Sequence, residues 1–416
     1  MNIWRNYAIE GTQDLLFEQC EIKNDIISKS RKVFKKFGFN EVQTPTLEFY
    51  DVFNFSNHPI EDEKIYKLID FKGRILTLRP DLTIPIARVY STKIKDGTAM
   101  LSYVGDVYRA NEHNHGKNNQ ITQCGIEIIG ISNIKAEILL LITAINTIKE
   151  IGIEEFKIEI GQCKFFEGIL EAIDFDDEEV SELENLIMNK NLGSLYSFLN
   201  KNKDKLDEEQ YKILRALPQL FGGKAVIDEA QELIKSEKAI NALRDLSYIY
   251  NTLESLGYSE YVSVDLAMIQ SFNYYTGAIF KGYTKEIGEE ILSGGRYDGL
   301  VGEFGEDSAA AGLAINVDAI QKLIYEKTKT GKTDEITGVI FFEKDSYANA
   351  IKIMNSLNKG NGNWQLNIQE SFEEVADYCR GKGINRIMKV NRNEVIEYRL
   401  SPTGVFIGEM FKNGKY

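Results

Sequence analysis

Two stretches, SYVGDVYRAN at 102–111 and QITQCGIEIIG at 120–130, decide the fold of this chain. Both are rich in Val, Ile and Tyr, which is typical of β-strands, and a polar segment separates them. Side chains alternate between the two faces of a strand, so Gln123, Gly125 and Glu127 share one face. A polar face on an otherwise apolar strand indicates a pocket rather than plain core.

The elements around these strands follow from hydrophobic periodicity. Residues 14–38 show the 3.6-residue repeat of a helix that ends at Gly38, and 39–48 alternates like a strand. Pro45 interrupts that strand, and because proline lacks a backbone N–H it should mark an edge or a bulge. Further predicted elements are apolar stretches at 64–69 and 74–78, helices at 81–92 and 134–150, and a strand at 156–160.

After residue 162 the pattern changes. Apolar residues recur at helical spacing among many Glu and Lys, which predicts an all-helical insertion. Strands on either side of it are expected to share one antiparallel sheet. The later predicted elements are strands at 262–269 and 278–283, glycine-rich turns at 293–305 and a helix at 317–327. The predicted domains are a core of 1–162 with 258–330, a helical insertion at 163–257 and a small α/β domain at 335–416.

The charge balance excludes some classes of function. The chain has 416 residues, with 49 Lys and Arg against 63 Asp and Glu, and a net charge of −14. This argues against a protein held on nucleic acid mainly by a positive surface. The four cysteines are far apart, and neither a signal peptide nor a long apolar run is present, so a cytoplasmic protein without a membrane span is expected. No phosphate-binding glycine loop or metal-ligand spacing occurs, so no cofactor or metal is expected.

Taken one at a time, the polar motifs have plain structural interpretations. Asp81 or Thr83, at the start of a helix, can cap it by accepting backbone N–H groups. Arg109 at a strand end is expected to be solvated or paired with a carboxylate. The segment NYYTG at 273–277 fits an aromatic hairpin, and SGGRYDG at 293–299 fits a turn because paired glycines allow positive φ.

Together and in this order, the motifs resemble the class II histidyl-tRNA synthetase family. The resemblance covers about residues 8–325 and, more loosely, the tail. It implies an α+β fold with an antiparallel sheet flanked by helices, and a homodimer with Pro45 at its interface. The matching segments are EGTQDLL at 10–16, GFNEVQTPTLE at 38–48, LRPDLT at 78–83, YRANEH at 108–113, QCGIEIIG at 123–130, NYYTGAIF at 273–280 and SGGRYDGL at 293–300.

The catalytic positions of that family are altered here. Gln270 replaces an arginine used in amino-acid activation, Asn119 the second arginine of the motif 2 loop, and Ala319 the arginine of motif 3. Of these cationic clamps, Arg109 remains. Losing one charged donor to a transferring phosphate costs roughly 3–4 kcal/mol. Three such losses leave little activation chemistry.

The amino-acid pocket of the family is better preserved. Carboxylates such as Asp81, which stands where the synthetases have Glu, suit an α-ammonium, Glu127 suits an imidazole N–H, and a tyrosine hydroxyl suits the other ring nitrogen. The missing arginine at position 270 weakens capture of the carboxylate. By resemblance, the histidine-binding positions are Asp81, Thr83, Arg109, Gln123, Glu127, Tyr274 and Tyr275.

A synthetase core without its ATP clamps but with this pocket resembles the ATP phosphoribosyltransferase regulatory subunit family, which also shares RPDLT. The resemblance implies a non-catalytic subunit that assembles with the short-form catalytic subunit into a hetero-octamer. Such a subunit is required for the first step of histidine biosynthesis and confers feedback inhibition by histidine. No tRNA or membrane partner is expected. The alternatives are an active histidyl-tRNA synthetase and a tRNA-binding paralogue.

The tail pattern predicts a small α/β unit. It fits either a reduced relative of the synthetase's anticodon-binding domain or a separate packing module. The predicted elements are strands at 337–343, 364–368 and 386–390 and helices near 345–358 and 371–382.

Overall fold

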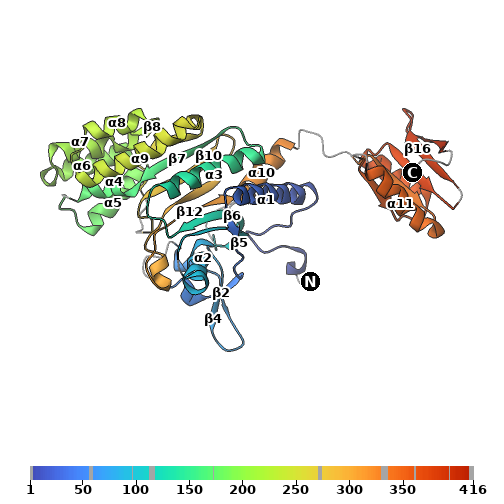
Figure 1. Cartoon of the computed structure of the whole chain (residues 1–416), viewed down its shortest axis with the longest axis horizontal. Helices are drawn as coiled ribbons and strands as arrows, with labels where there is room; N and C mark the ends of the chain where they lie inside the picture. Colours follow the sequence, from blue (N-terminus) through green and yellow to red (C-terminus); the bar gives the residue numbers. More distant parts are fainter. Residues whose placement is uncertain are drawn as a thin grey trace. The chain divides into compact units, whose positions relative to one another are not determined.

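The computed structural model of the chain divides into two compact units, Met1–Glu326 and Lys327–Tyr416 (Figure 1). Each unit is described by itself. The residues that the structure describes are 3–55, 60–95, 97–111, 118–171, 173–269, 274–328, 336–359, 362–392 and 394–411.

A nine-stranded sheet forms the centre of the first unit. In spatial order its strands are β1 (Asn40–Glu41), β5 (Ala99–Tyr108), β6 (Gln120–Ile129), β12 (Ala310–Asn316), β11 (Leu292–Arg296), β10 (Ala278–Thr284), β7 (Phe156–Gln162), β9 (Val262–Asp265) and β8 (Phe221–Gly222). The predicted pairing of β5 with β6 is confirmed, and strands from before and after the insertion pair antiparallel, as in β6–β12 and β7–β10. The pairs β1–β5 and β7–β9 are parallel, which makes the sheet mixed.

Helices cover both faces of this sheet. On one face lie α1 (Glu18–Lys36), α3 (Lys135–Ile151) and α10 (Val317–Thr328), and Figure 1 shows α1 and α3 lying across the strands. Apolar residues run almost all round α3, which is therefore buried along most of its length. Gly152 ends that helix with φ of 105°, a left-handed conformation that suits glycine. The opposite face carries α2 (Thr83–Val89), which runs into a π-helical turn at Tyr90–Ile94.

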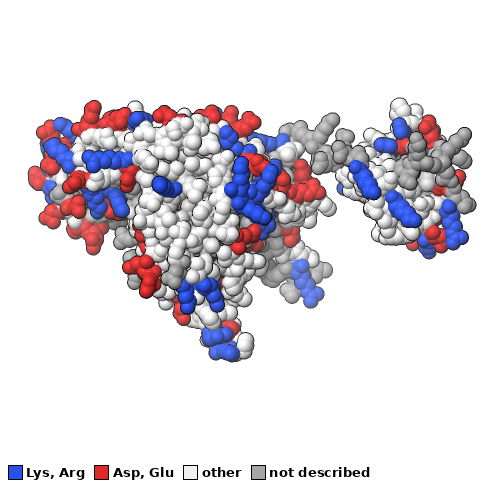
Figure 2. Space-filling view, viewed as in Figure 1, with Lys and Arg blue, Asp and Glu red and all other residues white. Residues whose placement is uncertain are grey.

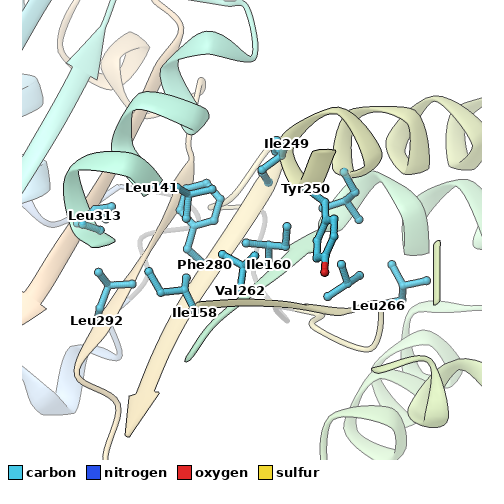
Figure 3. Packing of buried hydrophobic residues seen from close by; sticks show 14 of the residues in the cluster. Leu141, Ile158, Ile160, Ile249, Tyr250, Val262, Leu266, Phe280, Leu292 and Leu313 are labelled. Carbon is cyan, nitrogen blue, oxygen red and sulfur yellow. The ribbon is translucent and has the colours of Figure 1, made fainter. Parts of the chain in front are cut away.

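The insertion packs onto the β7 end of the sheet. Its helices are α4 (Cys163–Leu170), α5 (Asp177–Met188), α6 (Leu192–Lys201), α7 (Glu208–Ala216), α8 (Ala225–Glu232) and α9 (Glu237–Ser255). Asp176 and Asp207 begin α5 and α7 as capping boxes, because each carboxylate accepts the third backbone N–H of its helix. The core is continuous into this region: Figure 3 shows Ile249 and Tyr250 of α9 beside Ile160 and Val262 of the sheet.

Several sequence predictions are corrected. The helix predicted from residue 14 begins at Glu18, after Phe17 with a positive φ of 49°. The insertion is not entirely helical, since it contributes β8. The glycine-rich stretch predicted as turns begins with strand β11. Gly294 and Gly295 let β11 lie close to its neighbours, because a Cβ on Gly294 would be 2.3 Å from the carbonyl oxygen of Gly312.

A three-stranded sheet stands beside the large one. It consists of β2 (Leu47–Phe49), β4 (Ile75–Leu78) and β3 (Lys67–Ile69), with β4 in the middle. One face turns inward, where Glu48 accepts a 2.6 Å hydrogen bond from Arg88 of α2. The other face is apolar and open: Leu47, Phe49 and Leu68 keep 42–48% of their surface exposed.

The second unit is a five-stranded sheet with one helix on each face. Its strands, in spatial order, are β14 (Trp364–Asn367), β13 (Gly338–Phe342), β15 (Arg386–Val390), β16 (Val395–Leu400) and β17 (Phe406–Phe411), and its helices are α11 (Tyr347–Asn358) and α12 (Phe372–Lys382). Ile353 of α11 packs with Ile340, and Val375 of α12 packs with Val339 on the opposite side. The three predicted strands and two predicted helices are confirmed. The β16–β17 hairpin was not predicted.

A buried ion pair fastens α3 to the centre of the large sheet. Arg296 of β11 donates two hydrogen bonds of 2.6 and 2.7 Å to the carboxylate of Glu137 on α3, and both side chains are 6% exposed. A third contact joins Arg296 to Asp298 at 3.0 Å. This bidentate geometry satisfies the planar guanidinium inside the protein.

Replacing Arg296 with Met should lower the free energy of unfolding by about 3–5 kcal/mol, because it leaves the Glu137 carboxylate buried without its partner. Urea denaturation measures the loss. Lys32→Met serves as a control, since Lys32 pairs with Glu150 at the surface and should change stability little. Equal losses in the two variants would contradict a special role for the buried pair.

Candidate functional site

A cavity of about 180 Å³ lies on the face of the large sheet that α2 covers. This volume is below the roughly 300–1,000 Å³ of pockets for drug-sized ligands, so the cavity suits a molecule of amino-acid size. Six of the seven predicted histidine-binding residues line it: Asp81, Thr83, Arg109, Gln123, Tyr274 and Tyr275. The rest of the wall consists of Ile60, Ser293, Gly294, Tyr297, Gly312, Leu313 and Ala314.

Glu127, the seventh predicted residue, lies behind the wall. Its side chain is almost fully buried, at 1% exposure. The Thr83 hydroxyl donates to one carboxyl oxygen at 2.9 Å, and the Tyr297 hydroxyl donates to the other at 2.5 Å. Gly312 stands opposite Glu127 in the sheet, where a Cβ would lie 1.4 Å from the carboxyl oxygen. Glu127 therefore orients two wall residues and depends on a glycine beside it.

Burial raises the pKa of Glu127 to about 8, from an ordinary value of 4.5. Hydrogen bonds from Tyr297 and Thr83 favour the ionised form and act against this rise, while the charge of Asp81 adds to it. Burial also raises the pKa values of the Tyr274 and Tyr297 hydroxyls well above their ordinary value. At neutral pH these hydroxyls stay protonated and can donate.

Two opposite charges face the cavity at one end. As expected of a helix cap, Asp81 accepts a hydrogen bond of 2.8 Å from the backbone N–H of Ile84. Its other carboxyl oxygen lies 3.8 Å from Arg109, so this strand-end arginine is paired with a carboxylate, as predicted. Arg109 also donates to the carbonyl of Pro80 at 2.7 Å. Burial raises the pKa of Asp81, and Arg109 opposes the rise.

Three tyrosines form an aromatic wall. The rings of Tyr274 and Tyr297 stack with centroids 5.7 Å apart, and Tyr275 meets Tyr274 edge-on at 5.0 Å. The prediction of an aromatic hairpin is wrong, because β9 and β10 are not neighbours: both flank β7. The described residues just before β10 lie beside the end of β11, where the N–H of Thr276 donates to the carbonyl of Arg296 at 2.7 Å, and Tyr274 and Tyr275 line the cavity.

Two of the three altered synthetase positions lie within the described residues, and Gln270 lies outside them. Ala319, in the first turn of α10, is 2% exposed and packs in the main core. Asn119 makes hydrogen bonds to Glu10, Tyr66 and Asn111. Neither side chain lines the cavity.

Tyr297 is the functional residue that sequence reasoning missed. Its motif was recognised, but its glycines were assigned to a turn. If 292–296 had been predicted as a strand, Tyr297 at its end would have been expected beside Glu127.

The described residues contain no group of three or more His, Cys, Asp or Glu side chains that could hold a metal ion. Among the described helices, none combines the length and apolar character that crossing a membrane requires.

The raised pKa of Glu127 predicts a pH dependence of stability. Folded protein holds a proton that the unfolded chain releases, so the free energy of unfolding should fall as pH rises from about 4.5 to about 8, by up to roughly 1.4 kcal/mol per pH unit. In Glu127→Gln this contribution should vanish. Urea denaturation between pH 5.5 and 8 measures it, with the exposed Glu306→Gln as control. Parallel pH profiles for wild type and Glu127→Gln would contradict the assignment.

Comparison with known proteins agrees with this fold. The sequence profile of the histidyl-tRNA synthetase family, described as "Histidyl-tRNA synthetase", matches residues 11–320. A solved ATP phosphoribosyltransferase regulatory subunit/histidyl-tRNA synthetase from Bacillus halodurans C is 28% identical, with a TM-score of 0.81 over 93% of this chain and 98% of that one. A histidyl-tRNA synthetase from Nostoc sp. PCC 7120, 20% identical with a TM-score of 0.78 over 97% and 96% of the two chains, shares the fold.

Curated relatives match over nearly the full length. A protein of Bacillus cereus (strain G9842) is 42% identical over 96% of this chain and 95% of its own, and one of Clostridium acetobutylicum is 42% identical over 94% and 97%. Both carry the name ATP phosphoribosyltransferase regulatory subunit. The chain therefore belongs to the ATP phosphoribosyltransferase regulatory subunit family and has the fold of histidyl-tRNA synthetase.

Proposed function

We propose that the chain is a non-catalytic, cytoplasmic regulatory subunit of ATP phosphoribosyltransferase, required for the first step of histidine biosynthesis and for its inhibition by histidine. The observation that carries the proposal is the 42% identity over almost the whole chain to proteins of that name. The partner is the short-form catalytic subunit, in a hetero-octamer.

The charges of the site support a role without synthetase activity. Among the described residues that line the cavity, Arg109 is the one with a permanent positive charge. A triphosphate carries several negative charges and its transfer needs multiple cationic clamps. One arginine matches a single carboxylate instead. At two altered positions, Asn119 and Ala319 supply no charge.

Histidine is the ligand that the wall chemistry favours. Its carboxylate can pair with Arg109 and its ammonium with Asp81, two groups only 3.8 Å apart. An imidazole has one N–H donor and one nitrogen acceptor, and the wall offers tyrosine hydroxyls that serve either. The cavity volume of about 180 Å³ accommodates a ligand of this size.

The surface gives a tRNA little to hold. Figure 2 shows acidic and basic side chains interspersed over the insertion and a largely uncharged middle of the visible face. Basic side chains gather at α1, where Arg31 and Lys32 are already paired with Glu41 and Glu150. The net charge of −14 also argues against a chain that is held on nucleic acid mainly by positive charge.

Self-association through the three-stranded sheet completes the proposal. The exposed face of Leu47, Phe49 and Leu68 is apolar on an edge of the unit next to Pro45, the position expected at a dimer interface. Burying this face against a second copy removes its apolar surface from water.

Asp81→Asn should weaken histidine binding by roughly 30-fold, because it removes the charge that meets the ligand's ammonium while the amide oxygen still caps α2. Calorimetric titration with histidine measures the affinity. Titration of the complex with the short-form catalytic subunit, followed by phosphoribosyl-ATP formation, measures inhibition. The surface variant Glu306→Gln should bind and inhibit as wild type does. Wild-type protein that binds no histidine, or that catalyses robust histidine-dependent pyrophosphate exchange, would sink the proposal in favour of another function.

Phe49→Glu should convert a dimer into a monomer. Arg74, whose guanidinium lies over the Phe49 ring, is already paired with Asp70, so burying a new carboxylate in the apolar face against a second copy should be costly. Light scattering after gel filtration reports the mass. Tyr248→Glu, which adds the same charge to an exposed position of α9, should stay dimeric. A dimer that survives Phe49→Glu would place the interface elsewhere.

A further inference from the structure

The segment that follows β5 is held by a complete set of backbone hydrogen bonds. The N–H of Tyr108 donates to Arg79, that of Arg109 to Asn119, and that of Ala110 to Lys64, at 2.8–3.0 Å. The N–H of Asn111 donates to the side-chain oxygen of Asn119 at 3.0 Å. Asn119 therefore accepts hydrogen bonds from Arg109, the arginine of the cavity, and from Asn111, two positions later.

The same asparagine holds a turn near the start of the chain. Its side-chain amide donates to the carbonyl of Glu10 at 3.1 Å and to the Tyr66 hydroxyl at 2.9 Å. Its backbone N–H donates to the carbonyl of Gly11 at 2.6 Å. One side chain thus contacts three segments that lie far apart in the sequence.

The turn is shaped to fit against Asn119. Ile9 and Thr12 close it with a backbone hydrogen bond of 2.9 Å. Gly11 has φ of 75°, a conformation that side chains disfavour. A Cβ at Gly11 would lie 2.4 Å from the Asn119 side chain. This explains why the EGT motif, which the cavity does not use, needs a glycine at this position.

We propose that Asn119 is a positioning residue that couples the cavity's Arg109 to the turn at residues 9–12. A ligand carboxylate that engages Arg109 orders the segment after β5, and Asn119 passes that ordering to the turn. The proposal rests on the proposed function, because histidine supplies the carboxylate. Coupling of this kind is reciprocal. If the ligand shifts the equilibrium of the turn toward its ordered form by a certain factor, losing the ordered turn must lower the affinity for the ligand by the same factor.

Three variants separate the two sides of Asn119. Asn119→Ala removes its side-chain bonds to both segments. Asn119→Asp keeps the oxygen that accepts from Asn111 but loses the donor to Glu10. Gly11→Ala strains the turn and presses a methyl group against the Asn119 side chain, at a position outside the cavity. Asn146→Ala is the matched control, since Asn146 lies on α3, away from the cavity, and its side-chain amide donates to the Tyr258 hydroxyl.

The histidine dissociation constant, from calorimetry, should rise roughly tenfold in Asn119→Ala, equivalent to about 1.4 kcal/mol, and by a smaller factor in Gly11→Ala. It should not change in Asn146→Ala. Hydrogen exchange gives the second readout: histidine should slow exchange of the Thr12 amide in wild type, and this slowing should disappear in Asn119→Ala and in Asn119→Asp.

Either of two results would overturn the coupling. One is a histidine affinity that is unchanged in both Asn119→Ala and Gly11→Ala. The other is an exchange rate of the Thr12 amide that histidine does not change in wild type. Failure of the proposed function is recognised separately, as wild-type protein that binds no histidine. In that case the positioning of Arg109 is still judged by exchange of the Arg109 and Asn111 amides, which should accelerate in Asn119→Ala. Equal exchange rates there would overturn the positioning role as well.

Discussion

Burial of the Glu127 carboxyl group in the middle of the large sheet is the constraint on which the site depends. A carboxyl placed there needs hydrogen-bond donors, and Thr83 and Tyr297 supply them from two distant parts of the sequence. It also needs space, which Gly312 leaves open on the neighbouring strand. Because the first donor starts α2 and the second follows β11, satisfying one buried group fixes two walls of the cavity at once.

The walls fixed in this way hold Asp81 and Arg109 apart, so that each charge can still pair with a ligand. Asp81 is engaged by the backbone of α2 and Arg109 by the carbonyl of Pro80, so the two meet only at 3.8 Å. If the two side chains formed a closer ion pair, a ligand would have to break that pair before it could bind. The proposed ligand, a zwitterion, replaces this weak contact with one partner for each charge. Both charged side chains therefore stand near their proposed partners before binding, and the remaining cost is that of ordering the segment after β5.

The strand pair β5–β6, helix α3 and the cap at Asp81 could be predicted, because each depends on a local pattern. Strand β11 could not, since its paired glycines are typical of turns and become strand residues only between close neighbours. Alternation placed Glu127 on the face of the cavity but could not show that Thr83 and Tyr297 stand in front of it. The place of 274–277 at the cavity depends on the pairing of β10 with β7, which joins segments more than a hundred residues apart.

A hydrogen-bonded path leads from the cavity to the proposed self-association face. Arg79, two residues before Asp81, is buried and donates to the carbonyls of Thr44, Pro45 and Asp106. It thereby joins the segment before β2 to β5, the strand that ends at Tyr108. Regulation by histidine requires that the ligand bind one arrangement of the assembly more tightly than another. Asp81 follows Arg79 by two residues, and Arg109 follows the strand to which Arg79 donates. A change in the separation of the ligand's two charge partners is therefore transmitted to Pro45 or breaks these bonds, and breaking bonds of a buried guanidinium is the costlier course. The geometry thus favours transmission to the proposed self-association face.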